Sequence, residues 1–198
     1  MKIISDSAAE RFALEIIGHF YPEDTPFRQM LLKHSYQVCG KAESIMETPE
    51  AGSLGLNREL VIGGALLHDI GIGRCHAPDI LCMGTEPYIA HGVTGAQMLR
   101  NFGAETGMDL EAYARICERH TGTGLTVEDI RRQHLPLPER DFLPETPEEK
   151  LICLADKFYS KSGNMEEKSL SRIVRSMEKF GPETQKRWQE LCGLFGIR

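Results

Sequence analysis

The sequence of 198 residues lacks the features that mark several classes of protein. Its longest apolar stretches fall far short of the roughly 18 residues that a membrane-spanning helix needs. Residues 1–10 lack the long apolar core of a secretory signal. None of the six cysteines forms a Cys-x-x-Cys pair, which disfavours a zinc ribbon or a thioredoxin-type motif. These absences predict a cytoplasmic protein without membrane contact, whose cysteines are small buried apolar residues in a reducing compartment.

Basic residues are also too few for some partners. The 23 Lys and Arg are outnumbered by 29 Asp and Glu, which gives a formal net charge of -6. Binding to a nucleic-acid polymer or to an anionic membrane needs a cationic surface, so neither partner is expected. The length and an ordinary hydrophobic share of 41 % predict one compact domain over residues 1–198.

Strand patterns are missing as well, because no useful stretch alternates apolar and polar residues. Apolar residues instead recur three or four positions apart, so the predicted fold class is all-α. The expected helices occupy about residues 12–20, 26–48, 58–69, 91–102 and 110–120, a short stretch after Thr126, a stretch from 147 beyond 156, and then 166–180 and 183–195.

Capping and breaking residues mark the ends of these helices. Thr25-Pro26 and Thr146-Pro147 each read as an N-cap followed by proline at the first helical position, and Asn57 can cap a third helix. Gly71 and Gly73 are expected to end that helix. The segments 74–88 and 135–147 are expected to be connections, the first a loop or short helix and the second extended.

Several polar side chains stand beside apolar helical positions. His68 and Asp69 end an apolar helix, where they are costly unless paired, hydrogen-bonded or bound to a metal. Asp156 follows an apolar run with no Lys or Arg three or four residues before it, and the adjacent Lys157 is expected to turn away. Each residue also has a structural explanation. Asp156 could be partly exposed, and His34 could be a hydrogen-bonded core residue.

His91 begins a predicted helix and His120 ends one, so each could serve only as a cap. Together with the residues above they offer four imidazoles and two carboxylates on separate helices, the way helix bundles build metal sites. Such ligands suit Fe, Mn, Zn, Co or Ni rather than Cu(I) or an iron–sulfur cluster. Six donors exceed the needs of one tetrahedral zinc and suit a pair of metals.

The same residues resemble the motif series of the HD superfamily of metal-dependent phosphohydrolases, in the HDIG form with six ligand positions. The matching pieces, in order, are His34-Ser35-x-x-Val38, Leu67-His68-Asp69-Ile70-Gly71, His91-Gly92-x-x-Gly95-Ala96, Cys117-Glu118-Arg119-His120-Thr121-Gly122 and Leu154-Ala155-Asp156-Lys157. The resemblance implies a single-domain helical bundle of the HD type. Its core would cover about residues 27–161, followed by C-terminal helices at about 166–196.

The resemblance also implies roles for the six residues. One metal would be held by His34, His68, Asp69 and Asp156. Asp69 would bridge to a second metal, which His91 and His120 would also bind. His68 and Asp69 would thereby belong to the catalytic centre. The implied cofactors are two divalent transition-metal ions, with iron foremost and Mn, Zn, Ni or Co as alternatives.

The implied reaction is hydrolysis of a phosphoester or phosphoanhydride bond by a metal-activated hydroxide, on a small phosphorylated substrate such as a nucleotide or dinucleotide. An alternative is an HD-type mixed-valence diiron oxygenase acting on a phosphonate or polyol, and a third is a non-catalytic binding module. Ile72 stands where many HD phosphohydrolases carry Lys or Glu, so Arg74 and His76 are candidates for substrate binding. The C-terminal helices could cover the core or form a homodimer.

Overall fold

The computed structural model describes residues 7–198. The prediction that residues 1–10 are not a secretory signal therefore falls partly outside the described residues. The α-helices are α1 (Ala8–Phe20), α2 (Pro26–Met46), α3 (Pro49–Gly52), α4 (Arg58–Leu67), α5 (His91–Thr106), α6 (Glu111–Arg119), α7 (Val127–Arg132), α8 (Pro147–Asp156), α9 (Leu170–Met177) and α10 (Pro182–Leu194). The short 3-10 helices are η1 (Ile70–Arg74), η2 (Pro78–Ile80), η3 (Tyr88–Ala90) and η4 (Glu178–Phe180). The strands β1 (His76–Ala77) and β2 (Cys82–Met83) pair antiparallel. The predicted all-α class is confirmed.

The predicted caps begin the helices that position the core. The side chain of Thr25 accepts a hydrogen bond from the backbone N–H of Arg28, and Asn57 does the same for Leu60. Thr146 and Glu149 form a reciprocal capping box at the start of α8. These side chains satisfy backbone donors that a helix leaves unpaired in its first turn.

The structure differs from the sequence predictions at several boundaries. α4 ends at Leu67 rather than near Asp69, because the chain tightens into η1 and carries both glycines inside that turn. The segment after Arg74 contains the β1–β2 hairpin, whose two-residue strands are too short to show alternation. α9 begins at Leu170 rather than Glu166, and the short α3 follows directly on α2.

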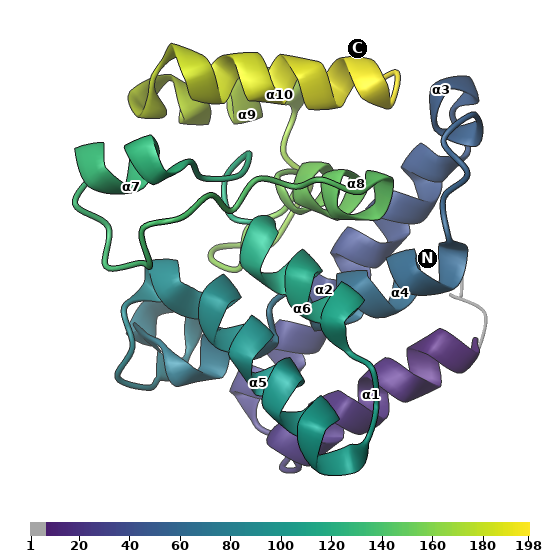
Figure 1. Cartoon of the computed structure of the whole chain (residues 1–198), viewed down its shortest axis with the longest axis vertical. Coiled ribbons are helices and arrows are strands. Elements are labelled where there is room, and N and C mark those ends of the chain that lie inside the picture. The colour runs from purple at the N-terminus through teal and green to yellow at the C-terminus, as the bar shows by residue number, and fades with distance from the viewer. Residues whose placement is uncertain (1–6) are drawn as a thin grey trace.

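The helices stack in layers along the long axis of the molecule (Figure 1). α9 and α10 lie across one end, and α1 and α5 lie toward the other. Between them, α2 packs against α4 and α8, while α5 packs against α6 and η1. α10 packs against α8, with Trp188 and Phe195 buried in the main core.

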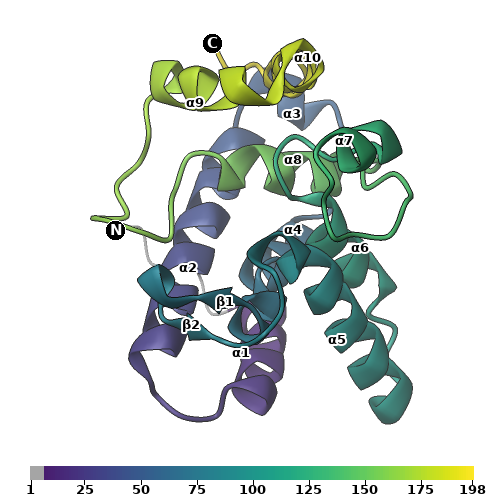
Figure 2. The same cartoon turned by 90° about the vertical axis from the view of Figure 1, so that its left-hand side faces the viewer.

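The hairpin lies against the α2 side of this bundle (Figure 2). A small second core joins them, formed by Leu31 of α2 with Ile72, Ile80 and Cys82. All six cysteines are free thiols, five of them buried, as expected for small apolar residues. Within residues 7–198, the helices are too short or too polar to cross a membrane.

Candidate metal centre

The six predicted ligand residues converge at one buried point. They come from the middle of α2 (His34), the junction of α4 and η1 (His68 and Asp69), the start of α5 (His91), the end of α6 (His120) and the last residue of α8 (Asp156). Their exposed fractions run from 0 % to 7 %. The bundle therefore brings together every position of the series, although up to 122 residues separate them along the chain.

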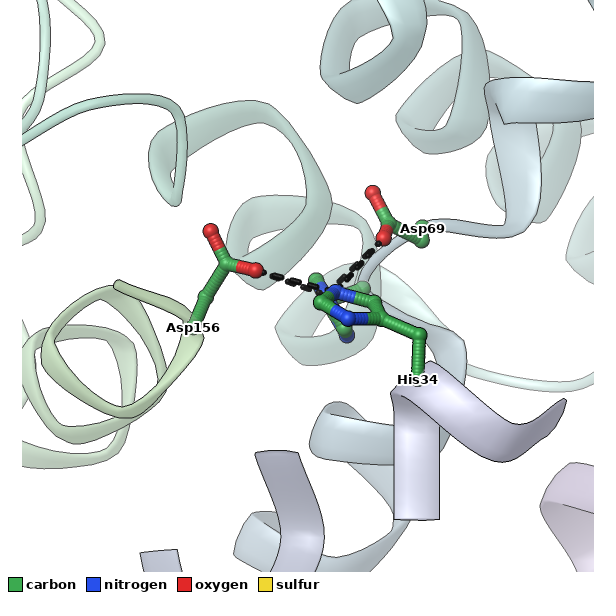
Figure 3. Close-up of side chains that lie close together, drawn as sticks. His34, Asp69 and Asp156 are labelled. Carbon is green, nitrogen blue, oxygen red and sulfur yellow. Dashed lines mark hydrogen bonds and ion pairs between the residues drawn. The ribbon is translucent and has the colours of Figure 1, made fainter. Parts of the chain in front are cut away.

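The carboxylate of Asp69 divides this cluster into two halves. Its Oδ2 lies 3.2 Å from His34 Nε2 and 3.1 Å from His68 Nε2. His34 Nε2 in turn lies 3.0 Å from Oδ1 of Asp156. Figure 3 shows His34 between the two carboxylates, with dashed lines to each. We call His34, His68 and Asp156 the Oδ2 half.

The other oxygen of Asp69 faces the remaining two residues. Oδ1 lies 3.5 Å from Nε2 of His91 and 3.5 Å from Nε2 of His120. We call His91 and His120 the Oδ1 half. Each half, together with Asp69, has its donor atoms within 4.8 Å of one another, a spacing at which they could hold a metal ion. One carboxylate oxygen thus faces each group.

The spacing of the imidazoles fits a shared cation. Nε2 of His91 and Nε2 of His120 face each other at 3.0 Å. Two nitrogens that bind one ion at about 2.0–2.1 Å and subtend about a right angle would be about 3 Å apart. The distance therefore agrees with two neighbouring ligands of a single ion.

Three of the four imidazoles are oriented by the backbone. The Nδ1 atoms of His68, His91 and His120 each lie 2.7 Å from the carbonyl oxygen three residues earlier, at Ala65, Tyr88 and Cys117 respectively. Nδ1 must carry the proton to donate these bonds. When the ring is neutral, the lone pair of Nε2 then points into the cluster, the arrangement that metal-binding histidines adopt.

Nε2 of His68 and Oδ1 of Asp69 are fully buried and have no ordinary hydrogen-bond partner. Oδ2 of Asp69 is also buried, and its neighbours are the ammonium of Lys161 and the imidazoles of His68 and His34. Burying polar atoms without partners is costly, and a bound cation would satisfy the first two. The residues present therefore fit divalent metal ions.

Two lysines that the sequence analysis did not place at the centre neutralise its carboxylates. Lys161 Nζ lies 2.8 Å from Oδ2 of Asp69, and Lys157 Nζ lies 2.7 Å from Oδ2 of Asp156. The expectation that Lys157 turns away is wrong. Lys157 follows the last residue of α8, and its flexible side chain folds back onto the neighbouring carboxylate.

The histidine pKa values shift in opposite directions in the two halves. Burial lowers the pKa of His91 to about 3, against the attraction of Asp69, and burial also lowers the pKa of His120. Burial acts in the same direction on His68, but the carboxylates of Asp69 and Asp156 outweigh it and raise the pKa to about 9.

The carboxylates stay ionised in spite of their burial. Burial favours the neutral form of Asp69, but His68 and Lys161 hold its pKa well below the usual value. Lys157 and Lys161 do the same for the pKa of Asp156. Both residues therefore offer anionic oxygens at neutral pH.

Two glycines of the motifs allow the elements to approach closely. A Cβ at Gly71 would lie 2.2 Å from the carbonyl oxygen of His91 and 2.3 Å from the backbone nitrogen of Gly95. A Cβ at Gly92 would lie 2.5 Å from the carbonyl oxygen of Cys117. Gly71 thus serves the packing of η1 on α5, and neither it nor Gly73 ends a helix in the left-handed conformation.

Arg74 and His76 lie away from this cluster. Both side chains are exposed, and within residues 7–198 neither forms a hydrogen bond or ion pair with any of the six residues. The structure therefore brings together the predicted metal ligands but not the predicted substrate-binding residues. Lys161 was missed because it follows α8 in a segment without helical spacing, and Lys157 was expected to turn away.

Comparison with known proteins agrees with this architecture. The model of the HD domain family matches residues 31–160. An uncharacterized protein of Methanocaldococcus jannaschii is 38 % identical over 121 residues, which cover 61 % of this chain and 59 % of that protein. A tRNA (cytidine(56)-2'-O)-methyltransferase of Thermoplasma volcanium is 32 % identical over 183 residues, 92 % of this chain and 44 % of the relative. The chain thus spans about half the length of these curated relatives.

Among solved structures, the HD domain of the L. monocytogenes phosphodiesterase PgpH aligns over 93 % of this chain and 95 % of its own, with a TM-score of 0.47 and 17 % identity. The family match covers well over half of the chain, so the protein belongs to the HD domain family. The assignment to the HD superfamily is confirmed.

Proposed function

We propose that this protein hydrolyses a phosphoester or phosphoanhydride bond of a nucleotide or dinucleotide at a centre of two divalent cations. His34, His68 and Asp156 would hold one cation, His91 and His120 the other, and Asp69 would serve both. The observation that carries this proposal is the division of the Asp69 carboxylate, with Oδ2 facing one half and Oδ1 the other.

Divalent cations bound here would lower the pKa of a water nucleophile and offset the charge that builds on the phosphoryl oxygens. The chain prepares this chemistry in three ways. Backbone carbonyls of Ala65, Tyr88 and Cys117 fix the imidazole tautomers. His68 and Lys161 keep Asp69 anionic, and Lys157 and Lys161 keep Asp156 anionic. Burial of all six residues removes bulk water, which strengthens electrostatic interactions within the centre.

The groups beside the centre favour a phosphorylated substrate that carries a nucleobase. Lys157 and Lys161 place two ammonium groups next to the carboxylates. Tyr88 stacks on His91 with ring centroids 5.0 Å apart and 29° between planes, and it is 40 % exposed. An exposed aromatic face can stack a nucleobase, and ammonium groups can pair with phosphate oxygens. Arg74 and His76 stay candidates for contacts with more distant parts of the substrate.

The test is metal analysis followed by a substrate screen. We expect about two Mn²⁺, Fe²⁺ or Ni²⁺ ions per chain and release of phosphate or a nucleotide from a panel of nucleotides and dinucleotides. Asp69→Ala and His68→Ala should abolish turnover and lower the metal content. Asp79→Ala, at an exposed aspartate of η2, should leave both unchanged.

Two outcomes would contradict the proposal. Turnover that survives Asp69→Ala would place catalysis elsewhere. Iron-dependent consumption of O2 on a phosphonate or polyol, without hydrolysis of any nucleotide, would establish the oxygenase alternative, since imidazole and carboxylate ligands serve both chemistries.

A further inference from the structure

Oδ2 of Asp69 is the most crowded atom of the centre. The ammonium of Lys161 lies 2.8 Å from it, and the imidazoles of His68 and His34 lie 3.1 and 3.2 Å away. The Lys161 side chain is only 9 % exposed. A buried ammonium is therefore placed against the oxygen that faces the Oδ2 half.

A divalent cation at this position would be incompatible with that contact. The cation would approach Oδ2 to about 2.0–2.2 Å, the usual distance for a carboxylate ligand. The ammonium of Lys161 would then face a double positive charge within a few ångströms, in a region from which water is excluded and charges are weakly screened. Lys161 and a cation therefore compete for Asp69.

The chain around Lys161 allows its side chain to move without unfolding a helix. Residues 157–169 form an irregular connection between α8 and α9. It is held to α2 at its far end, where Gln37 Nε2 donates to the carbonyl oxygen of Met165 and Lys41 pairs with Glu167. Lys161 lies before these tethers, so rotation of its side chain breaks neither of them.

The balance of charge indicates what the Lys161 ammonium would bind once a cation displaces it from Asp69. Without cations, Lys157 and Lys161 offset Asp69 and Asp156. Two divalent cations would add four positive charges, and the centre would then attract a polyanion. A phosphate group drawn to the cations would lie within reach of Lys161.

We propose that Lys161 exchanges partners: it pairs with Asp69 when no cation is bound and binds a phosphate oxygen of the substrate when cations occupy the centre. This inference rests on the proposed function. It makes Lys161 a substrate-binding residue that also weakens metal binding, a role that a purely structural ion pair would not have.

The first test measures metal affinity without substrate. Mn²⁺ binding is followed by competition with a chromogenic chelator at pH 7 for the wild type, Lys161→Met and Lys161→Gln. Removing the competing ammonium should tighten the apparent Kd by at least about fivefold, the lower end of typical coupling between two sites. Lys186→Met makes the same change of net charge on the exposed face of α10 and should leave the Kd unchanged.

The second test measures phosphate binding at saturating Mn²⁺. Inorganic phosphate should bind the Lys161 variants at least about fivefold more weakly than the wild type, by calorimetry. In turnover, KM should rise more than kcat falls. Lys161→Arg, which keeps the charge, should restore part of the phosphate affinity. Circular dichroism and thermal melting establish that each variant is folded.

The outcomes separate this inference from the proposed function. Tighter Mn²⁺ together with weaker phosphate supports the exchange. Tighter Mn²⁺ with unchanged phosphate would reduce Lys161 to a counter-ion and overturn it, and so would unchanged Mn²⁺ affinity. In both of those cases the metal centre would stand, provided that the wild type binds two ions and hydrolyses nucleotides. A wild type that binds neither Mn²⁺ nor phosphate would overturn both proposals.

Discussion

The two halves of the cluster share Asp69 but differ in the charges of their other buried side chains. The Oδ2 half contains a second carboxylate, Asp156, and two lysines that offset the negative charge. The Oδ1 half contains only His91 and His120, whose Nε2 atoms lie 3.0 Å apart. The Oδ2 half thus contains opposite charges that offset each other, whereas the Oδ1 half consists of neutral imidazoles.

This difference bears on how each half would hold a cation. With Asp69, the Oδ2 half offers four side chains and two anionic groups, whereas the Oδ1 half offers three side chains and shares its single anionic group. More ligands and more negative charge favour a divalent ion. We therefore expect the Oδ2 half to hold its ion more tightly, in spite of the competition from Lys161.

The largest expected effect comes from removing one ligand in either half. His120→Gln should leave one tightly bound Mn²⁺ per chain, whereas His34→Gln should weaken the tighter of the two sites. Either change should lower kcat/KM by at least about 100-fold, because a metal ion contributes several kcal/mol of charge stabilisation in the transition state. Calorimetric titration with Mn²⁺ measures the stoichiometry and the two affinities.

His19→Gln is the matched control for these variants. His19 is exposed on α1 and contacts Phe20 and Phe102 rather than the cluster. It should keep both ions and full activity. If His34→Gln kept the tighter ion, the ranking of the halves would be reversed. If His120→Gln lost both ions, the Oδ2 half would not hold its ion alone, and the ranking would be contradicted.

The sequence was sufficient to predict that these six residues meet, because the HD motif series selects them and the helical periodicity places them on separate helices. His34 and Asp156 stand among apolar residues at helical intervals, and the caps at Thr25, Asn57 and Thr146 fix where three of the helices begin. Once the helices pack on their apolar faces, the positions of these backbone atoms follow, and short side chains such as Asp and His reach only a small region.

The lysines and the hairpin could not be predicted in this way. Lys161 follows α8 in a segment without periodicity, and its long side chain can reach many partners, so sequence spacing does not select Asp69. The strands β1 and β2 have two residues each, too few to show a period of two. Arg74 follows the HDIG motif closely in the sequence, but its side chain is exposed, and closeness in sequence does not determine where a long side chain points.

A smaller effect is expected from a substitution at Gly71, where η1 packs against α5. Gly71→Ala would push η1 away from the carbonyl oxygen of His91 and the backbone of Gly95, both of which are parts of α5. We expect a loss of about 1–3 kcal/mol in the free energy of unfolding, the usual cost of overpacking. Mn²⁺ binding should weaken more in the Oδ1 half, which is supplied partly by α5.

Gly40→Ala serves as the control for this substitution. Gly40 lies in α2, and a Cβ there would have no heavy atom within 4 Å. Because alanine is the better helix former, it should stabilise the protein by about 0.5–1 kcal/mol. Urea denaturation measures both changes, and equal effects of the two substitutions would contradict the close approach at Gly71.

The smallest expected effect is on the pH dependence of the free energy of unfolding, measured on protein from which EDTA has removed the metal. The two halves should contribute to this dependence in opposite directions. The pKa of His91 is about 3 in the folded protein, against an ordinary histidine pKa of 6.5. Below pH 6.5 only the unfolded chain takes up this proton, so acidification to pH 5 should lower stability. The two carboxylates, whose ordinary pKa is 3.8, contribute mainly below this window.

The Oδ2 half should respond in the opposite direction. The pKa of His68 is raised to about 9, so its contribution is fully present below pH 6.5 and is lost as the pH rises from there. Stability should therefore fall on both sides of about pH 6.5, by at most about 1.4 kcal/mol per pH unit for each group. Urea denaturation at pH 5, 6.5 and 8 measures this profile. His91→Gln should reduce the slope on the acidic side alone, where the lowered pKa of His120 leaves a remainder, and His68→Gln should flatten the alkaline side alone. A profile that the two substitutions changed equally would show that the halves titrate as one unit.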